Sequence, residues 1–335
     1  MNLIMSKNLK QKFLITGSAG FFGSHMAEKA LSMGHEVVAI DILNSETTPA
    51  IEKEKNIIIL ENLSKENQVK FKKYKTDIRD GEALEKIFKE ESPNIIIHAA
   101  ALARDRDSMD IPLEFIQTNV IGSQNVINAA MNISSIEQCV VISTRSAVGQ
   151  AASAETLMTE DALMRPINPY GATKLAMEGL FHSYHSDEKV PIKICRMQPI
   201  YGPRCRHDMF VWRILNSILT GEKIQKYGTG EGVRDWLYIS DAVDAVFALI
   251  DTEVSYDVFN IGVGQMTSTN DLIKICEETT GNKANIENIA AVRGDAIFAG
   301  IADCTKIAKT CGWKAKIKIQ DGIKKTHDYM RDNKT

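Results

Sequence analysis

The feature that most constrains this chain is a glycine-rich turn near its start. A short β-branched and aromatic segment from Phe13 runs into Gly17, Gly20 and Gly23. Apolar residues then recur at helical spacing, at Met26, Ala27, Ala30 and Leu31. This pattern predicts a strand, a tight turn and a helix. The three glycines allow a sharp turn, close approach of a pyrophosphate and close packing of the helix, and the free N–H groups at the helix start favour an anion.

A second predicted strand ends in an acidic residue. Val37 to Ile40 lead to Asp41, about 20 residues beyond the glycines, where an acid binds a ribose 2′-hydroxyl. A carboxylate there repels a 2′-phosphate, so the sequence predicts NAD rather than NADP. A loop cap is the alternative for Asp41 taken alone. The expected cofactor contacts at this end are Gly17, Gly20, Phe21, Phe22, Gly23 and Asp41.

Strand and helix patterns alternate through the first half of the chain. Further strands are expected at 71–76, 93–98 and 139–144, each separated from the next by a helical pattern. Such alternation predicts an α/β fold, a Rossmann-type doubly wound parallel sheet with helices on both faces. Ligands bind such sheets at the carboxyl ends of the strands.

The second half of the chain is more mixed and contains no clear linker. We expect residues 10–195 to form the NAD-binding domain, with segments near 235–262 returning to it. Residues 196–335 are expected to form most of a smaller, mixed α/β lobe that binds the substrate. A chain of 335 residues is long enough for two such lobes.

Several residues follow the later strands. Asp77 either meets the adenine amino group or caps the next helix. The small residues 99–101 let the backbone lie close under a cofactor, and His98 is expected to be a packed strand-end residue rather than a base. The charges at 104–107 are expected to form a solvated loop. A long helical pattern follows over 112–131.

Composition excludes some classes of function. Net charge is −3, which gives no general attraction to nucleic acid or to an anionic membrane. No apolar run reaches membrane-spanning length, and Met1 to Lys12 lack a signal-peptide core, so a cytoplasmic protein is expected. The six cysteines are scattered without a C-x-x-C pair, which predicts free thiols and no metal site.

A Tyr-x-x-x-Lys pair carries the predicted chemistry. Tyr170 and Lys174 share one face of a helix, because residues four apart in a helix are neighbours. An adjacent ammonium lowers the pKa of a phenol, and the resulting tyrosinate accepts a proton from a sugar hydroxyl while hydride leaves for nicotinamide. Thr144, at the end of a strand, is expected to hydrogen-bond the same hydroxyl.

Together these motifs resemble the extended short-chain dehydrogenase/reductase family, and within it the nucleotide-sugar epimerases and dehydratases. The resemblance covers almost the whole chain and is closest to UDP-glucuronate and UDP-hexose 4-epimerases. It implies bound NAD, Thr144, Tyr170 and Lys174 as catalytic residues, and Lys174 also on the nicotinamide ribose. Further cofactor contacts implied by the matching motifs are Asp77, Ile78, Ala99, Ala100, Ala101, Asn119 and Tyr170.

The resemblance also implies a nucleoside-diphosphate sugar held by the carboxy-terminal lobe. Arg234 matches a diphosphate-binding arginine and Arg293 matches a second, since a guanidinium fork suits phosphate. A surface ion pair is the alternative for either. Gln198 stands where many hexose epimerases carry an asparagine near the substrate phosphate. Arg206 lies in 202–209, which resembles the Gly-Pro-x-Gly-Arg-Pro-Asp-Met of UDP-glucuronate 4-epimerases, although Cys205 and His207 depart from it.

Two residues argue against water loss as the reaction. The 4,6-dehydratases usually carry an Asp-Glu pair where this chain has Arg145 and Ser146. Arg145 either contacts an anionic sugar or phosphate or points away. The sequence therefore predicts an NAD-dependent nucleotide-sugar 4-epimerase that acts through a transient 4-keto sugar. The alternatives are a 4-dehydrogenase or 4,6-dehydratase of the same family and a non-catalytic NAD-sensing protein.

The resemblance further implies a homodimer through two long helices, at 112–131 and 170–186. Antiparallel pairing of such helices across a two-fold axis makes a four-helix bundle. The apolar positions are Phe115, Val120, Val126 and Ile127, which alternatively belong only to the monomer's own core.

Overall fold

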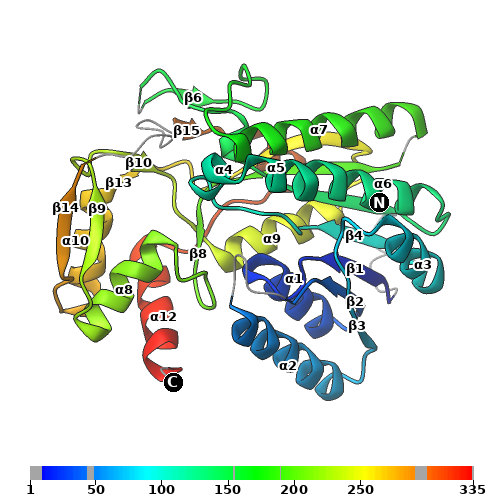
Figure 1. Ribbon diagram of the computed structural model, residues 1–335, viewed down its shortest axis with the longest axis horizontal. Coiled ribbons are helices and arrows are strands. Elements are labelled where there is room, and N and C mark those ends of the chain that lie inside the picture. Colours follow the sequence, from blue (N-terminus) through cyan, green and yellow to red (C-terminus); the bar gives the residue numbers. More distant parts are fainter. Residues whose placement is uncertain (1–9, 44–48, 154, 189, 291–299, 334–335) are drawn as a thin grey trace.

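A seven-stranded parallel sheet forms the centre of the molecule (Figure 1). The computed structural model describes residues 10–43, 49–153, 155–188, 190–290 and 300–333. The strand order is β12-β7-β5-β4-β1-β2-β3. The strands are β1 Lys12–Thr16, β2 Glu36–Asp41, β3 Phe71–Lys75, β4 Ile95–His98, β5 Gln138–Thr144, β7 Ile192–Met197 and β12 Tyr256–Ile261. The predicted Rossmann-type doubly wound sheet is confirmed.

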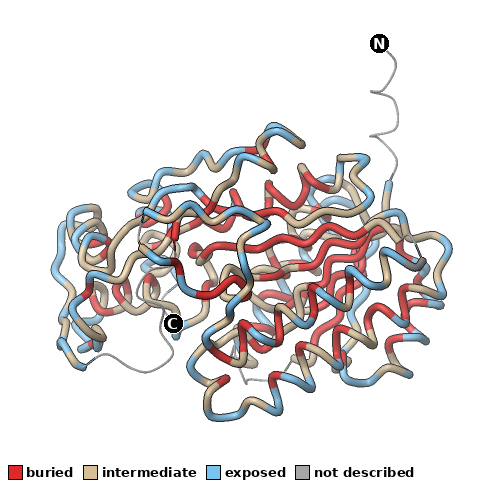
Figure 2. The backbone as a smooth tube through the Cα atoms, turned by 90° about the horizontal axis from the view of Figure 1, so that it is seen from above, coloured by how far each residue is buried: buried red, intermediate tan, exposed pale blue. Residues whose placement is uncertain are grey.

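Alternating side chains bury both faces of this sheet. Phe13 and Ile15 point into one core and Leu14 into the other, as the two-residue period of a strand requires. The first face is covered by α1 Phe21–Ser32, α2 Ala50–Glu66, α9 Ile239–Ile250 and α11 Thr305–Cys311. The second is covered by α3 Gly81–Glu91, α6 Gly122–Met131 and α7 Pro169–Glu188. Figure 2 shows the buried strands between these two helix layers.

The long helix expected over 112–131 contains a π-helical segment. The structure has α4 Asp107–Asp110, α5 Pro112–Phe115, a π-helical segment η1 Ile116–Ile121, and then α6. Asn119 lies within η1, and its carbonyl accepts a hydrogen bond from Ser123 Oγ at 2.6 Å. A π-helical turn is rare and typically occurs beside a functional site. The helical pattern predicted over 112–131 is therefore confirmed, and the π-helical segment within it is a feature that the sequence did not indicate.

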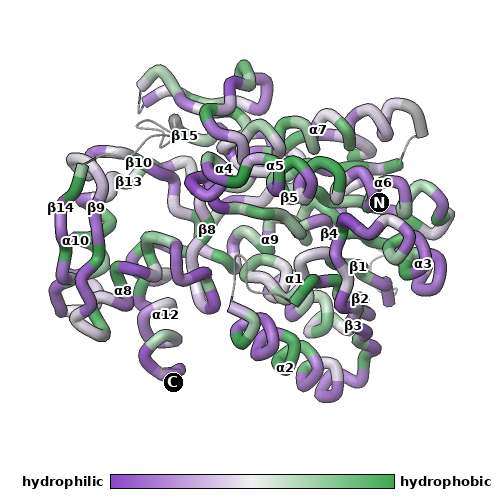
Figure 3. Tube along the Cα trace, in the orientation of Figure 1, coloured by the Kyte–Doolittle hydropathy of each residue, from purple (hydrophilic) through white to green (hydrophobic). Residues whose placement is uncertain are grey.

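Most of the apolar positions suggested for a dimer contact belong to the monomer. Phe115, Val126 and Ile127 are at most 3% exposed, and Val120 is half-buried. Val126 and Ile127 pack in the second core, and Phe115 packs with Leu102 and Tyr170. The exposed apolar side chains of the same region are Ile111, Leu113, Ile116 and Ile121. Figure 3 shows hydrophobic colour along α5.

The remaining elements form a smaller cluster beside the carboxyl ends of the strands (Figure 1). Its helices are α8 Phe210–Thr220, α10 Thr269–Thr280 and α12 Ile319–Asp332, which pack on one another. Paired short strands complete it, namely β9 Ile224–Tyr227 with β14 Ile286–Ile289, β10 Val233–Arg234 with β13 Thr267–Ser268, β8 Ile200–Tyr201 with β11 Leu237–Tyr238, and β6 Leu157–Met158 with β15 Ile301–Ala302. Within the described residues no helix has the length and apolar character needed to cross a bilayer.

Candidate active site

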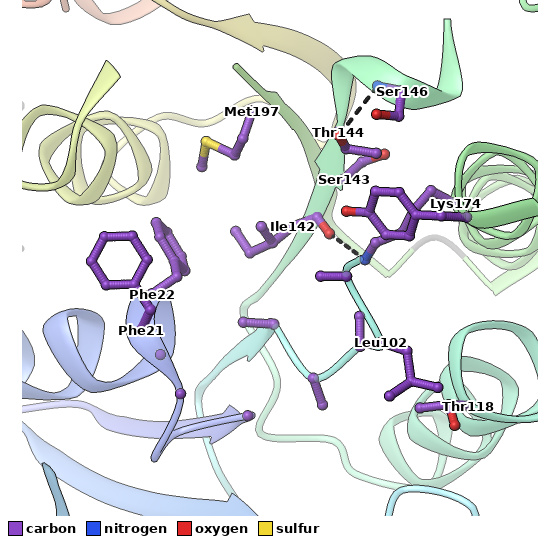
Figure 4. Close-up of a pocket in the computed structure, with 18 of the residues that line it drawn as sticks. Phe21, Phe22, Leu102, Thr118, Ile142, Ser143, Thr144, Ser146, Lys174 and Met197 are labelled. Atoms are coloured by element: carbon purple, nitrogen blue, oxygen red, sulfur yellow. Dashed lines mark hydrogen bonds between the residues drawn. The ribbon is translucent and has the colours of Figure 1, made fainter. Parts of the chain in front are cut away.

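A cavity of about 400 Å³ opens at the carboxyl ends of the sheet strands. Its walls come from the glycine turn, the ends of β2, β4 and β5, the start of α7, and the chain that follows β7 (Figure 4). The carboxyl edge at the switch between β1 and β4 is where such sheets bind ligands. Nearly all residues named from sequence line it, namely Gly17, Gly20, Phe21, Phe22, Gly23, Asp41, Asp77, Ile78, Ala99, Ala100, Ala101, Thr144, Arg145, Tyr170, Lys174, Gln198, Arg206 and Arg234.

The glycine turn is too tight for side chains at two positions. Gly17 has φ +70°, and a Cβ there would lie 2.8 Å from backbone atoms of Ala100. A Cβ on Gly23 would lie 2.1 Å from the carbonyl oxygen of Gly17. Backbone therefore packs directly on backbone, and the first turn of α1 faces the cavity. A concave turn lined by free N–H groups fits a pyrophosphate.

Asp41 is a buried carboxylate at the end of β2. Its Oδ2 accepts a hydrogen bond from the Ala19 amide at 3.0 Å, and its Oδ1 accepts from the Leu43 amide at 2.9 Å and from Lys53 Nζ at 2.8 Å. Asp41 thus does cap the neighbouring loops, the alternative noted from sequence, and it also lines the cavity. With the glycine turn, this carboxylate fits the adenosine end of NAD.

Lys53 is a cavity residue that sequence reasoning missed. It belongs to α2 and its side chain is 8% exposed, paired with that of Asp41 at 4%. The segment around it is polar and rich in lysine and glutamate, which is typical of a solvent-exposed segment. Lys53 is the fourth residue of α2, the helix that follows β2. That position, near the strand that ends in Asp41, is the feature of the sequence that could have indicated its role.

The walls beyond the glycine turn resolve two further alternatives. Asp77 lines the cavity and pairs with Arg79, while the N-cap of α3 is Asp80, which accepts from the Ala83 amide at 3.0 Å. The alternative that Asp77 caps this helix is therefore wrong. His98 is a packed residue as expected, hydrogen-bonded to Thr16 and Ser123, and burial lowers its pKa to about 3.

Asn119 lies behind the cavity wall rather than on it. Its side chain accepts from the Leu102 amide at 2.8 Å and donates to the Leu102 carbonyl and to Thr173 Oγ1, both at 3.0 Å. These bonds join the wall segment after β4 to α7, and a direct contact of Asn119 with the cofactor stays a prediction.

Thr144, Tyr170 and Lys174 meet at one wall. Tyr170 and Lys174 lie in the first two turns of α7, whose start is fixed by Asn168 Oδ1 accepting from the Gly171 amide at 2.8 Å. The Thr144 hydroxyl hydrogen-bonds the Tyr170 phenol. Lys174 Nζ donates to the Ile142 carbonyl at 2.8 Å, the contact dashed in Figure 4. The three side chains therefore come together as predicted.

The protein's own groups do not lower the pKa of the phenol. Burial and the Asp105 carboxylate raise the pKa of Tyr170, and the Thr144 hydrogen bond and the Arg206 charge oppose this rise. Burial also lowers the pKa of Lys174 to about 8, and Glu178 opposes that change. Burial is the largest cause of the raised phenol pKa, and the Lys174 ammonium is held at a strand-end carbonyl. The expectation that Lys174 and bound NAD lower the phenol pKa stays a prediction.

A buried ion pair braces this wall from behind. Glu178, one turn after Lys174, accepts from Arg196 Nη2 at 2.8 Å and from Arg196 Nε at 3.1 Å. Ser143 Oγ donates to the same carboxylate at 2.5 Å. Both ion-pair partners are 7% exposed or less. These contacts join α7, β5 and β7. Separating the three elements would leave an uncompensated buried charge, which is costly, so the contacts hold them in place.

The opposite side of the cavity is cationic. Arg206 donates to Asp208 from Nε at 3.0 Å and from Nη2 at 3.1 Å, and to the Ala103 carbonyl. Arg234 lies at the cavity with Nη1 donating to its neighbouring carbonyl at 2.7 Å. Gln198 is buried, and its Oε1 has no hydrogen-bond partner among the residues that the structure describes. Arg293 lies outside the described residues.

Asp105 is a second cavity residue that sequence reasoning missed. The charged run at 104–107 was expected to be a solvated loop, yet Asp105 lines the cavity and its Oδ2 lies 3.5 Å from Ser146 Oγ. The signal was present in the position of the run, directly after the carboxyl end of a buried strand. The prediction of a solvated loop is therefore wrong at Asp105.

Comparisons with known proteins identify the group. Residues 13–262 match the NAD dependent epimerase/dehydratase family. A UDP-glucuronate 4-epimerase of Thermodesulfobacterium geofontis is 31% identical over 96% of this chain and 96% of that protein. Protein CapI of Staphylococcus aureus is 28% identical over 95% of this chain and 98% of its own length.

Solved structures agree with the sequence relatives. The Bacillus cereus UDP-glucuronic acid 4-epimerase in complex with UDP-glucuronic acid and NAD has a TM-score of 0.87 and 31% identity, covering 96% of this chain and 99% of that one. A Thermotoga maritima UDP-glucose 4-epimerase with UDP-glucose has a TM-score of 0.85 at 29% identity and the same coverage. The predictions of NAD as cofactor and of an NAD-dependent nucleotide-sugar 4-epimerase are confirmed. The chain belongs to the NAD dependent epimerase/dehydratase family.

Proposed function

We propose that the enzyme inverts C4 of a UDP-linked uronic acid. The observation that carries this proposal is the placement of Thr144, Tyr170 and Lys174 between the glycine turn and the arginine side of one cavity. The relatives supply the class of sugar, since UDP-glucuronate 4-epimerases match over almost the whole chain. In this arrangement residues 10–195, with the returning segments near 235–262, hold NAD. Most of 196–335 holds the nucleotide sugar, with Gln198, Arg206 and Arg234 toward the diphosphate and sugar, and Arg293 as a further diphosphate contact.

Tyr170 is the proposed acid/base group. Its phenolate takes the proton of the C4 hydroxyl, and Thr144 orients that hydroxyl by hydrogen bonding. When bound, NAD would supply the acceptor for the C4 hydride and the donor for its return. Lys174 supplies positive charge beside the phenol and the nicotinamide ribose. After the 4-keto sugar turns over, Tyr170 gives the proton back, so the reaction has no net redox change and consumes no cofactor.

Product analysis tests this proposal. The purified protein incubated with UDP-glucuronate should form UDP-galacturonate, observed by proton NMR, without net reduction of added NAD. Tyr170→Phe should not form it. Accumulated reduced cofactor would identify a 4-dehydrogenase instead. A 4-keto-6-deoxy product from a neutral hexose nucleotide would identify a 4,6-dehydratase, and NAD binding without any turnover would identify an NAD-sensing protein.

We also propose a homodimer formed by α5, η1 and α7. These elements are neighbours, and they expose Leu113 (71%), Ile116 (44%) and Ile121 (51%). Small exposed residues, Ala172, Ala176 and Gly179, lie on one face of α7 and permit close approach of a second helix. Light scattering at micromolar concentration should give about twice the chain mass, and Leu113→Lys should shift it toward the monomer. We further propose that the enzyme is cytoplasmic and serves carbohydrate biosynthesis.

A further inference from the structure

The arginines of the cavity differ in how their charges are compensated. Arg206 is held by both carboxylate oxygens of Asp208. Arg145 donates from Nη2 to the Gly149 carbonyl, and among the described residues no carboxylate oxygen lies within 4.0 Å of its guanidinium. Asp105 is the acid whose charge acts on it, from a greater distance. Arg145 therefore presents a cation to the cavity without a contacting carboxylate.

The local chain fixes this guanidinium in place. Arg145 begins the short helix η2 Arg145–Ala147, which starts when the Ser146 amide donates to Thr144 Oγ1 at 3.2 Å. Gly149 has φ +95°, and a Cβ there would lie 1.9 Å from the Arg165 carbonyl oxygen. The carbonyl that holds Arg145 is thus part of a tightly packed turn. A side chain held in this way loses little conformational entropy when it binds a ligand.

The position of Arg145 selects one part of the substrate. It directly follows Thr144, which hydrogen-bonds the Tyr170 phenol. If C4 reacts at Tyr170, the groups nearest this end of the cavity are those on C3 and C5. In a pyranose C6 is attached to C5, while the diphosphate is attached to C1 on the opposite side of the ring. A cation beside Thr144 is therefore placed for a charge on C6 rather than for the diphosphate.

We propose that Arg145 binds the C6 carboxylate and is the residue that makes this enzyme select nucleoside-diphosphate uronates over neutral hexoses. The inference rests on the proposed function, because it places C4 at Tyr170. Arginine and carboxylate pair through two parallel hydrogen bonds, and the contact to Gly149 leaves the other donors of the guanidinium available.

The electrostatics of the cavity support this assignment. Burial and the nearby Arg234 charge together lower the pKa of Arg145 to about 10, and the Asp105 charge opposes both. The side chain remains a cation at neutral pH, so the desolvation it has undergone is uncompensated until an anion arrives. A neutral hydroxymethyl group on C5 supplies no such charge.

Binding measurements with three ligands test the proposal. Arg145→Ser and Arg145→Lys are compared with the parent in a Tyr170→Phe background, so that no turnover disturbs the titration. Calorimetry of the NAD-loaded protein measures the Kd values of UDP-glucuronate, UDP-glucose and UDP. Arg331→Ser is the matched control, because it removes an exposed arginine from α12, far from the cavity in sequence and paired only with Asp328 and Asp332 among the described residues.

The expected result is selective. Arg145→Ser should weaken UDP-glucuronate by about 10- to 100-fold, the range for a hydrogen bond between charged groups, and change UDP-glucose and UDP by less than about threefold. Arg145→Lys should recover part of the loss, and the control should change nothing. Turnover with UDP-glucuronate and UDP-glucose, measured in the Tyr170 parent, should show the same selectivity.

Three results would overturn the proposal. Equal weakening of all three ligands assigns Arg145 to the diphosphate, and no weakening of any assigns it to the fold. A parent enzyme that turns over UDP-glucose but not UDP-glucuronate refutes selection for uronates while leaving 4-epimerisation intact. Absence of turnover with every nucleotide sugar refutes the proposed function alone, because the selective loss of binding in Arg145→Ser is measured without turnover.

Discussion

The cofactor side of the cavity is formed largely by backbone, whereas the sugar side is formed by long side chains. On the cofactor side the walls are turns of backbone, such as the one at Gly17 and Gly23, set at the ends of parallel strands. On the sugar side they are long side chains, Arg145, Arg206 and Arg234, carried by segments far apart in sequence. Backbone turns cannot change without disturbing the fold, whereas side chains can. The contrast teaches that sugar specificity depends on side chains that can be replaced, whereas the glycine turn on the cofactor side tolerates little change.

The largest expected effect comes from filling the backbone turn. In Gly23→Val the first added carbon would lie 2.1 Å from the Gly17 oxygen, so the turn and α1 must separate. We expect loss of bound NAD and destabilisation of more than about 3 kcal/mol. Cofactor content and Tm measure both. Gly34→Asn is the control beyond the other end of α1. A Cβ added at Gly34 meets no atom within 4 Å among the described residues outside its chain neighbours, and asparagine tolerates the φ of +85° there. Retained NAD in Gly23→Val would break the contrast between the two sides.

Removing the proton acceptor should affect chemistry alone. Tyr170→Phe keeps the ring that packs against Phe115 but removes the hydroxyl. General acid–base losses are on the order of 10²–10⁴ in kcat. NAD content and the Kd of UDP-glucuronate should stay close to the parent values, because neither side of the cavity is rebuilt. Wild-type turnover in this variant would exclude Tyr170 as the acid/base group.

The carboxylate at the end of β2 should set cofactor choice. Asp41→Ala removes the charge that repels a 2′-phosphate and leaves Lys53 without its partner at 2.8 Å. We expect the ratio of NAD to NADP affinity to fall by about 10- to 100-fold, the value of one or two charged interactions. Fluorescence titration with both cofactors measures the ratio. In Asp41→Ala the 2′-phosphate of NADP loses the repulsion of Asp41 and gains the attraction of the unpaired Lys53. The double variant Asp41→Ala with Lys53→Met removes that attraction and so separates the two effects. An unchanged ratio in both variants would contradict the assignment of Asp41.

The smallest effect is a change in the pH profile. Burial lowers the pKa of Lys174 to about 8, so its ammonium is present below that pH and is lost as pH rises through it. If the reaction needs this charge, kcat/KM should fall by about tenfold between pH 7 and 9. Lys174→Arg stays charged and should move the fall to higher pH. A profile that is identical in both enzymes would assign the titration to another group.

The site residues that the sequence predicted are those that belong to one local motif, and those that it missed are placed by the assembled sheet. The glycine turn, Asp41 and the Tyr170–Lys174 pair have fixed spacings within single strand–turn or helix units, so local pattern was sufficient. Lys53 and Asp105 were missed because they lie in polar segments, and only the assembled sheet edge turns them toward the cavity. Asn119 was placed on the wall because the sequence of 112–131 gives no sign of the π-helical segment that sets it behind Leu102.

The order of strands in the sheet has a consequence for synthesis of the chain. β12 pairs with β7 at the edge of the sheet, yet residues 198–255 lie between them. At typical translation rates of 5–20 residues per second, β7 waits roughly 3–12 s for its partner strand. During that time the strand Ile192–Met197, which is fully buried in the folded protein, presents an unpaired edge, the kind of surface that recruits other chains. Chaperone dependence of expression should therefore respond to substitutions in β12 more than to substitutions in the arginine side of the cavity.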